Sequence, residues 1–221
     1  MILRLAPSLS RTFTTAARRT PSSLYTKVSQ NSRATTSTPS DLTDTEREVL
    51  EGALRVDQAG EIAANYIYMG QKAVLGRDKE LGELIQDMWD QEKKHLLVMD
   101  KLQVQHNVRP TALSEVAKVA GFALGAVTGL MGKEAAMACT EAVETVIGEH
   151  YDDQLKDLAT FSSNHESLPL LQDVIQEFRD DELEHLDIAV DNFSHQAPAH
   201  ALLSSLVGAG CKVAIEVCKR I

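Results

Sequence analysis

The tetrapeptides Glu92-Lys93-Lys94-His95 and Glu182-Leu183-Glu184-His185 decide how this 221-residue chain folds. In each, a glutamate precedes a histidine by three residues, so both side chains lie on one face of an α-helix and can converge on one metal ion. Only two of the seven histidines have a glutamate at this spacing. Chance alone supplies about one such pair, so the interpretation depends on the surrounding residues.

Both pairs interrupt a stripe of apolar residues that recurs at helical intervals. The stripe around the first pair contains Leu81, Ile85, Met88, Met99 and Leu102. The stripe around the second pair contains Leu171, Ile175, Phe178 and Ala189. Both glutamates are therefore expected inside a helical core, where an ionised carboxylate is unfavourable unless it is paired or binds a metal.

Two further glutamates occupy comparable positions on other predicted helices. Glu61 shares an apolar stripe with Leu50, Leu54 and Tyr68. Glu144 shares one with Met137, Tyr151, Leu155 and Leu158. Glu61 lies 31 residues before Glu92 and Glu144 lies 38 residues before Glu182, and each distance suits one helical hairpin. A single glutamate followed by E-x-x-H thus occurs twice, which predicts an internal repeat of two hairpins.

Capping signals and helix breakers give the bounds of the predicted helices. Thr43 and Glu46 form a capping box at the start of the first, Gly76 ends it, and Pro110 stops the second. We expect helices at about residues 43–75, 79–107 and 132–160, and a fourth that begins after Pro169 and ends near Gln196. The fold class is therefore all-α, a four-helix bundle built from two hairpins.

The first forty residues differ in composition from the rest of the chain. They contain no Asp or Glu, six Lys or Arg residues and many Ser and Thr residues. This composition is typical of a mitochondrial transit peptide, and a disordered basic tail is the alternative. We therefore expect a leader at residues 1–40 and one domain at residues 41–221.

The net charge of the domain argues against a nucleic-acid partner. Removing the six basic residues of the leader changes the formal net charge from −10 to −16. A protein that binds nucleic acid needs basic patches to neutralise phosphate, so no nucleic acid is expected.

Two apolar segments lie outside the four predicted helices, at residues 111–131 and 199–219. The first includes fourteen consecutive uncharged residues, 119–132, and the second is interrupted by Lys212 and Glu216. Both look too short to span a bilayer, which takes roughly twenty residues. They either lie in a membrane interface or pack on the bundle.

Together the hairpins offer four carboxylates and two imidazoles, which is the ligand set of di-iron and di-manganese bundle proteins. Hard oxygen ligands with two imidazoles suit iron or manganese better than zinc, and oxygen chemistry favours iron. We expect two iron ions, with Glu92 and Glu182 bridging and Glu61 and Glu144 terminal. The alternative is a ring of Glu–His hydrogen bonds without metal. The predicted ligands are Glu61, Glu92, His95, Glu144, Glu182 and His185.

Other polar residues are expected around these ligands. Asp57 and Asp181 either hold the outer ring nitrogens of the histidines or lie at the surface. His150 and Tyr151 are candidates for groups that contact the ligands rather than the metal. The remaining histidines lie near predicted helix ends or in linkers and carry no specific signal: His106, His165, His195 and His200.

Five motifs, in order along the chain, resemble the mitochondrial 5-demethoxyubiquinone hydroxylases of coenzyme Q biosynthesis, which are ferritin-like di-iron monooxygenases. The resemblance covers about residues 50–219, and all six predicted ligands match the family pattern. The motifs are RVDQAGE at 55–61, MWDQEKKH at 88–95, GFALGA at 121–126, GKEAAMACT at 132–140 and FRDDELEH at 178–185.

The resemblance implies hydroxylation of the ring of a polyprenylated 5-demethoxyubiquinol by O2 and reducing equivalents. The electron donor would be NADH or NADPH, acting directly or through a reductase, and Tyr151 and His150 would either contact the ligands or relay electrons. Partners would be the coenzyme Q biosynthesis complex and its lipid-binding accessory protein. The expected location is the matrix side of the mitochondrial inner membrane, with peripheral contact through the apolar segments.

Three rival functions remain to be separated from this one. An alternative oxidase also uses E-x-x-H pairs at a membrane surface, but this chain lacks that family's flanking helices. A ferritin-like iron store is argued against by the uncharged segment 119–132. A lipid-carrying bundle without metal is the third.

Overall fold

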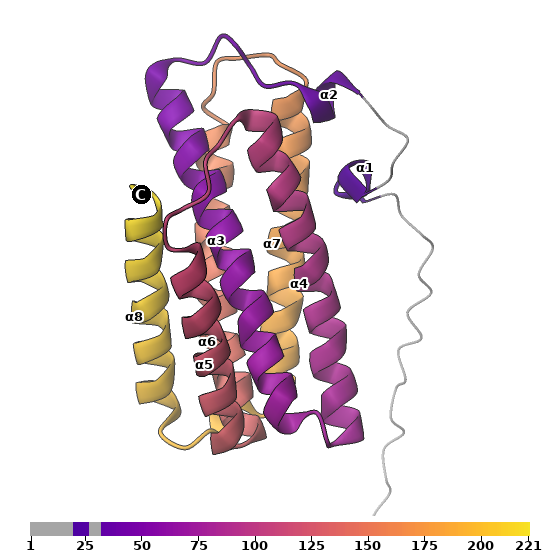
Figure 1. Ribbon diagram of the computed structural model, residues 1–221, viewed down its shortest axis with the longest axis vertical. Coiled ribbons are helices and arrows are strands. Elements are labelled where there is room, and N and C mark those ends of the chain that lie inside the picture. Colours follow the sequence, from indigo (N-terminus) through magenta and orange to yellow (C-terminus); the bar gives the residue numbers. More distant parts are fainter. Residues whose placement is uncertain (1–19, 27–31) are drawn as a thin grey trace, which may run out of the picture.

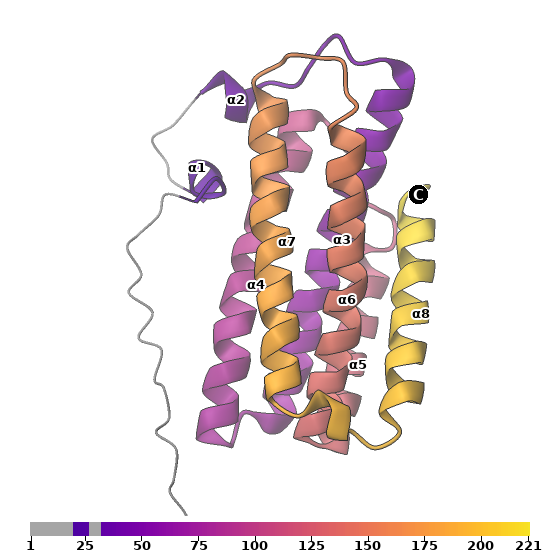
Figure 2. The same ribbon diagram turned by 180° about the vertical axis from the view of Figure 1, so that it is seen from behind.

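The computed structural model describes residues 20–26 and 32–221, and every regular element within them is helical (Figures 1 and 2). Four long helices, α3, α4, α6 and α7, run side by side as a bundle, which confirms the predicted all-α architecture of two hairpins. The elements are α1 (Ser23–Thr26), α2 (Arg33–Thr36), α3 (Asp44–Leu75), α4 (Lys79–His106), α5 (Ser114–Met131), α6 (Lys133–Leu158), α7 (Ser167–Asp191), the 3-10 helix η1 (Ser194–Gln196) and α8 (His200–Cys218).

The first three predicted helices begin and end within two residues of the expected positions, and the fourth does not. The Thr43 hydroxyl accepts a hydrogen bond from the Glu46 backbone N–H (3.2 Å), and the Glu46 carboxylate accepts one from the Thr43 N–H (2.8 Å), so the predicted capping box is present. Both predicted bounds of the fourth helix are wrong, because α7 ends at Asp191 rather than near Gln196 and begins at Ser167 rather than after Pro169. Proline is tolerated there because N–H groups in the first turn of a helix have no partner within the helix.

The core of the bundle has two apolar clusters with the glutamates between them. One contains Leu54, Met99, Tyr151 and Phe178, and the other contains Tyr68, Met88, Met137 and Ala189. Along each of the four long helices, the buried glutamate lies between a residue of the first cluster and a residue of the second. Apolar packing therefore fixes the helices on both sides of a polar layer.

Helix α5 lies against α3 at very short range because glycines line the contact. A Cβ atom on Gly125 would lie 2.0 Å from the Ile67 carbonyl oxygen, and one on Gly70 would lie 2.3 Å from that of Phe122. Only glycine allows the two backbones to approach this closely. Several large side chains of α5 remain exposed on its outer face, among them Val119 at 74% and Leu130 at 76%.

Helices α5 and α8 are both apolar and mostly uncovered. Both helices pack on the bundle, α5 on α3 and α8 on α6, yet only 22% of the α5 segment and 11% of the α8 segment are buried, so the membrane-interface alternative stays open for their outer faces. By length and composition alone, both are long and apolar enough to cross a membrane. The sequence predicts that both segments are too short for this. The 18 residues of α5 form a helix about 27 Å long, close to the roughly 30 Å thickness of a bilayer's hydrocarbon core.

The predicted leader at residues 1–40 lies mostly outside the described residues, but its described parts contact the bundle. The Ser22 N–H and hydroxyl donate to the Glu177 carboxylate of α7 at 2.8 and 2.7 Å. The Tyr25 side chain is 4% exposed, and its hydroxyl donates to Gln105 of α4 (2.9 Å). Figures 1 and 2 show α1 beside α4 and α7. The boundary at residue 40 stays a prediction.

Deleting residues 1–40 is expected to lower the melting temperature relative to deleting residues 1–19. Only the longer deletion removes Tyr25 from the core, and burial of a large apolar side chain contributes roughly 1.5–3 kcal/mol. In a domain of this size, 1 kcal/mol corresponds to about 2–4 °C. Differential scanning fluorimetry measures the difference, and Tyr25→Ala in the shorter deletion should reproduce part of it. Equal melting temperatures for the two deletions would contradict the docking of this segment.

Candidate metal centre

The structure brings the six predicted ligands together in the polar layer of the bundle. Each of the four long helices contributes a glutamate, and α4 and α7 also contribute a histidine one turn later. Every one of these side chains is at most 3% exposed. The residues are Glu61 on α3, Glu92 and His95 on α4, Glu144 on α6, and Glu182 and His185 on α7.

The six side chains form two groups that share two members. Ligand atoms of Glu61, Glu92, His95 and Glu182 lie within 4.8 Å of one another, and so do those of Glu92, Glu144, Glu182 and His185. The shared residues, Glu92 and Glu182, are the two for which bridging was predicted. The geometry can thus hold two ions side by side, and the ligand assignment stays a prediction.

Each histidine also faces the glutamate of the other E-x-x-H pair. His95 Nδ1 lies 3.2 Å from Glu182 Oε1, and His185 Nδ1 lies 3.0 Å from Glu92 Oε1. These contacts cross between α4 and α7, so the two pairs form one centre. Both hairpins are required to complete it.

Burial has large electrostatic effects on this centre. It raises the pKa of Glu61 and Glu144 well above the ordinary value for a glutamate, and the charges of Glu92 and Glu182 raise both further. For His185, burial lowers the pKa, but hydrogen bonds and charges from Glu182 and Glu92 outweigh it and raise the pKa to about 11. Without a metal, the centre therefore retains protons at neutral pH.

The donor set fits a pair of divalent ions better than a hydrogen-bonded ring. Glu61 Oε2 is buried and makes no hydrogen bond within the described part of the chain, although it belongs to one ligand group. A buried polar atom without a partner is unfavourable, and coordination to a cation removes this penalty. Carboxylate oxygens and imidazoles are donors that suit iron and manganese.

Two tyrosines hold the outer glutamates by hydrogen bonds between helices. Tyr151 of α6 donates to Glu61 Oε1 of α3 (2.7 Å), and Tyr68 of α3 donates to Glu144 Oε1 of α6 (3.2 Å). Sequence reasoning expected Tyr151 near the ligands but missed the role of Tyr68. The signal was available, because each tyrosine follows the glutamate of its own helix by seven residues.

The two aspartates near the centre have different partners. Asp181 Oδ2 lies 2.9 Å from His95 Nε2, as predicted for the outer nitrogen of a ligand. Asp57 instead binds His150 (Nε2 to Oδ1, 3.0 Å) and accepts a hydrogen bond from Gln154 (2.9 Å). His150 therefore lies behind Asp57 rather than against a predicted ligand.

A narrow cleft between α3 and α6 reaches the four glutamates. Its other lining residues are Val56, Asp57, Gly60, Ala64, Ile147, His150 and Tyr151. Ile147 also packs in an apolar cluster that includes Leu124 of α5 and Val207 of α8. The cleft thus lies where both apolar helices flank the bundle.

A family model described as "Ubiquinone biosynthesis protein COQ7" matches residues 48–218. The chain belongs to this family. It is 50% identical over 175 residues, 79% of each chain, to the Homo sapiens protein named "NADPH-dependent 3-demethoxyubiquinone 3-hydroxylase, mitochondrial". It is 43% identical over 190 residues, 81% of this chain and 82% of the other, to "5-demethoxyubiquinone hydroxylase, mitochondrial" of Saccharomyces cerevisiae. The "3-demethoxyubiquinol 3-hydroxylase" of Rhodospirillum rubrum is 47% identical over 173 residues, 78% of this chain and 79% of the other.

The COQ7-family match covers the whole candidate centre. All six predicted ligands, both tyrosines and the apolar helices α5 and α8 lie within residues 48–218. The segment at residues 20–40 that contacts α4 and α7 lies outside it. The apolar helices are therefore part of the family's domain, and the resemblance seen in the sequence is confirmed.

Metal uptake by this COQ7-family chain is expected to release protons and to strengthen as pH rises. Because the pKa values of Glu61 and Glu144 are raised and that of His185 is about 11, these groups carry protons at pH 7 that a metal ion must displace. Titration calorimetry with Fe²⁺ under anaerobic conditions, in two buffers of different ionisation enthalpy, counts the protons. Glu144→Gln, which has no proton to lose, should reduce the count. A count of zero with pH-independent affinity would contradict this electrostatic account.

Proposed function

We propose that this chain hydroxylates the ring of a demethoxyubiquinol during ubiquinone biosynthesis, using two iron ions held by Glu61, Glu92, His95, Glu144, Glu182 and His185. The observation that carries the proposal is the pair of buried ligand groups that share Glu92 and Glu182. The chain is a member of the COQ7 family, and relatives 43–50% identical to it are named as demethoxyubiquinone or demethoxyubiquinol hydroxylases.

The overall reaction in this proposal is a monooxygenation. One atom of O2 enters the ring as a hydroxyl group and the other leaves as water, with two electrons and two protons supplied from outside the chain. The donor is NADH or NADPH, directly or through a reductase, and the names of the mammalian relatives favour NADPH. When bound, a pair of iron ions supplies the O2-activating chemistry that amino-acid side chains lack.

The chain's own residues orient the donors and exclude water. Asp181 fixes the ring of His95 by binding Nε2, so that Nδ1 faces Glu61 and Glu182. Tyr151 and Tyr68 restrict the Glu61 and Glu144 carboxylates through their hydroxyls. The apolar clusters on either side of the polar layer keep bulk water from the centre.

The polyprenyl substrate reaches the centre from a membrane in this proposal. The exposed apolar faces of α5 and α8 would lie in the interfacial layer. The ring would enter between α3 and α6, where the cleft, now about 10 Å³ in volume, has to widen to admit it. The surface is the matrix side of the mitochondrial inner membrane, reached after removal of the basic leader. Relatives carry the word mitochondrial in their names. We also propose that the coenzyme Q biosynthesis complex and its lipid-binding accessory protein are partners.

Glu92→Ala is expected to reduce hydroxylation to background while the helical content stays unchanged. The substitution removes a residue common to both ligand groups, whereas apolar packing on either side still holds the helices. Mass spectrometry of quinones from cells that contain only the variant should show the demethoxy precursor. Asp90→Asn, a change at an exposed carboxylate on the same helix, is the control and should restore the product. Normal product with Glu92→Ala would reject the proposed role of the centre.

Replacing Phe122 and Leu130 of α5 with lysine is expected to release the protein from liposomes. These side chains are 40% and 76% exposed, so the bundle should tolerate the change while membrane insertion of the charges is unfavourable. Flotation with vesicles measures binding. Val104→Lys, at an 80% exposed apolar position on α4, is the matched control. Unchanged flotation of the double variant would reject the interfacial role of α5.

A further inference from the structure

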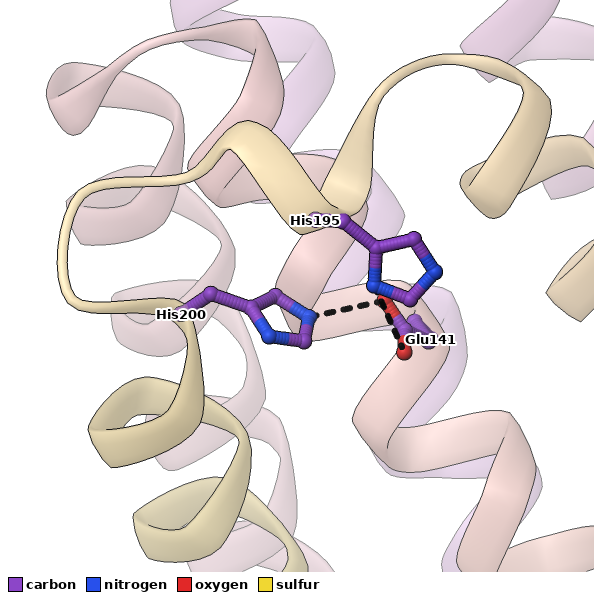
Figure 3. A group of neighbouring side chains, drawn as sticks. All are labelled: Glu141, His195 and His200. Atoms are coloured by element: carbon purple, nitrogen blue, oxygen red, sulfur yellow. Dashed lines mark hydrogen bonds and ion pairs between the residues drawn. The ribbon is translucent and has the colours of Figure 1, made fainter.

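A second group of potential metal ligands lies outside the buried centre (Figure 3). It consists of Glu141 on α6, His195 in η1 and His200, the first residue of α8. Their ligand atoms lie within 4.8 Å of one another. Figure 3 shows both imidazole rings directed at the Glu141 carboxylate. None of the three belongs to the ligand groups of the buried centre.

The donor atoms of the three side chains are separated by distances close to those of a metal site. His200 Nε2 lies 3.0 Å from Glu141 Oε2, His195 Nδ1 lies 3.9 Å from Glu141 Oε1, and the two ring centroids are 5.0 Å apart. In a tetrahedral zinc site the ligand atoms are about 2.0–2.1 Å from the metal and therefore about 3.3 Å from each other. The two separations from Glu141, 3.0 and 3.9 Å, lie on either side of this value.

The backbone around both histidines adopts an unusual conformation. Among the described residues, three that are not glycine have positive φ: Asn107, Phe193 and Ala199. Phe193 (φ 69°) lies two residues before His195, and Ala199 (φ 52°) directly precedes His200. This left-handed conformation is unfavourable for phenylalanine and alanine. The backbone therefore adopts an energetically unfavourable conformation at two positions, in the segment that places both imidazole rings next to Glu141.

We propose that Glu141, His195 and His200 bind a divalent transition-metal ion of the zinc class. Two imidazoles and one carboxylate form a three-ligand set that leaves a fourth position for water. The site is open to solvent, because the His195 side chain is 60% exposed, whereas those of His200 and Glu141 are 24% and 17% exposed. The Ser204 hydroxyl lies 3.4 Å from His200 Nε2, where it can hydrogen-bond a metal-bound water.

A metal at this site would link three elements. It would join α6 to η1 and to the first turn of α8, across at least 54 positions of sequence. Helix α8 is only 11% buried and contacts α6 along one face, through Leu203, Val207 and Cys211. The ion would therefore anchor the start of α8 against α6, independently of the metal content of the buried centre.

Zinc titration of the full chain tests this site. By calorimetry and elemental analysis, the unmodified protein should bind about three Zn²⁺ ions, two of them in the buried centre. His195→Ala and Glu141→Gln should each remove one equivalent or weaken it by about tenfold or more. His195 is exposed and Glu141→Gln preserves shape, so both variants should fold. His165→Ala, at a histidine in the loop between α6 and α7, is the matched control and should leave the count unchanged.

A second arm separates the two sites. Glu92→Ala disrupts the buried centre, and in that background one Zn²⁺ equivalent should remain and then disappear when His195→Ala is added. Zinc should also raise the melting temperature of the unmodified protein more than that of His195→Ala. Identical zinc affinity and stoichiometry in the unmodified protein, His195→Ala and Glu141→Gln would overturn the proposal.

Discussion

Burial of four carboxylates and two imidazoles at the centre of the bundle is the constraint on which the rest of the structure depends. Removing these groups from water is unfavourable, and mutual contacts alone leave Glu61 Oε2 without a hydrogen bond among the described residues. Two apolar clusters pack the same four helices on both sides of the polar layer. Their packing holds the ligands in place, and coordination of cations would offset the cost of burial.

The repeat of two hairpins also determines which side chains and helices surround the centre. In each hairpin, one helix carries the E-x-x-H pair and the other carries a glutamate followed by a tyrosine. Each tyrosine donates a hydrogen bond to the glutamate of the other hairpin. Helix α5 packs along α3 through glycines, and α8 packs on α6. The face of the bundle that contains the cleft is thereby flanked by apolar side chains. A membrane-held quinone and a buried centre are compatible in this arrangement.

Features that follow from the helical repeat, such as the buried faces, could be predicted from the sequence. Contacts between side chains far apart in the sequence could not. The apolar stripes place Glu61, Glu92, Glu144 and Glu182 in one layer because a buried helix face repeats at a fixed interval. The pairing of Asp57 with His150, and the docking of Tyr25, depend on side chains 93 and 80 residues from their partners, and no period encodes them. His195 and His200 showed no signal for the same reason, because Glu141 meets them only after α8 folds back.

Anomalous diffraction at the iron edge, from crystals of the anaerobically reconstituted protein, tests the central claim most directly. Two peaks are predicted between Glu92 and Glu182, one on the side of Glu61 and His95 and the other on the side of Glu144 and His185. A fully folded protein with no peak within the bundle, or with iron bound only by other residues, would contradict the account.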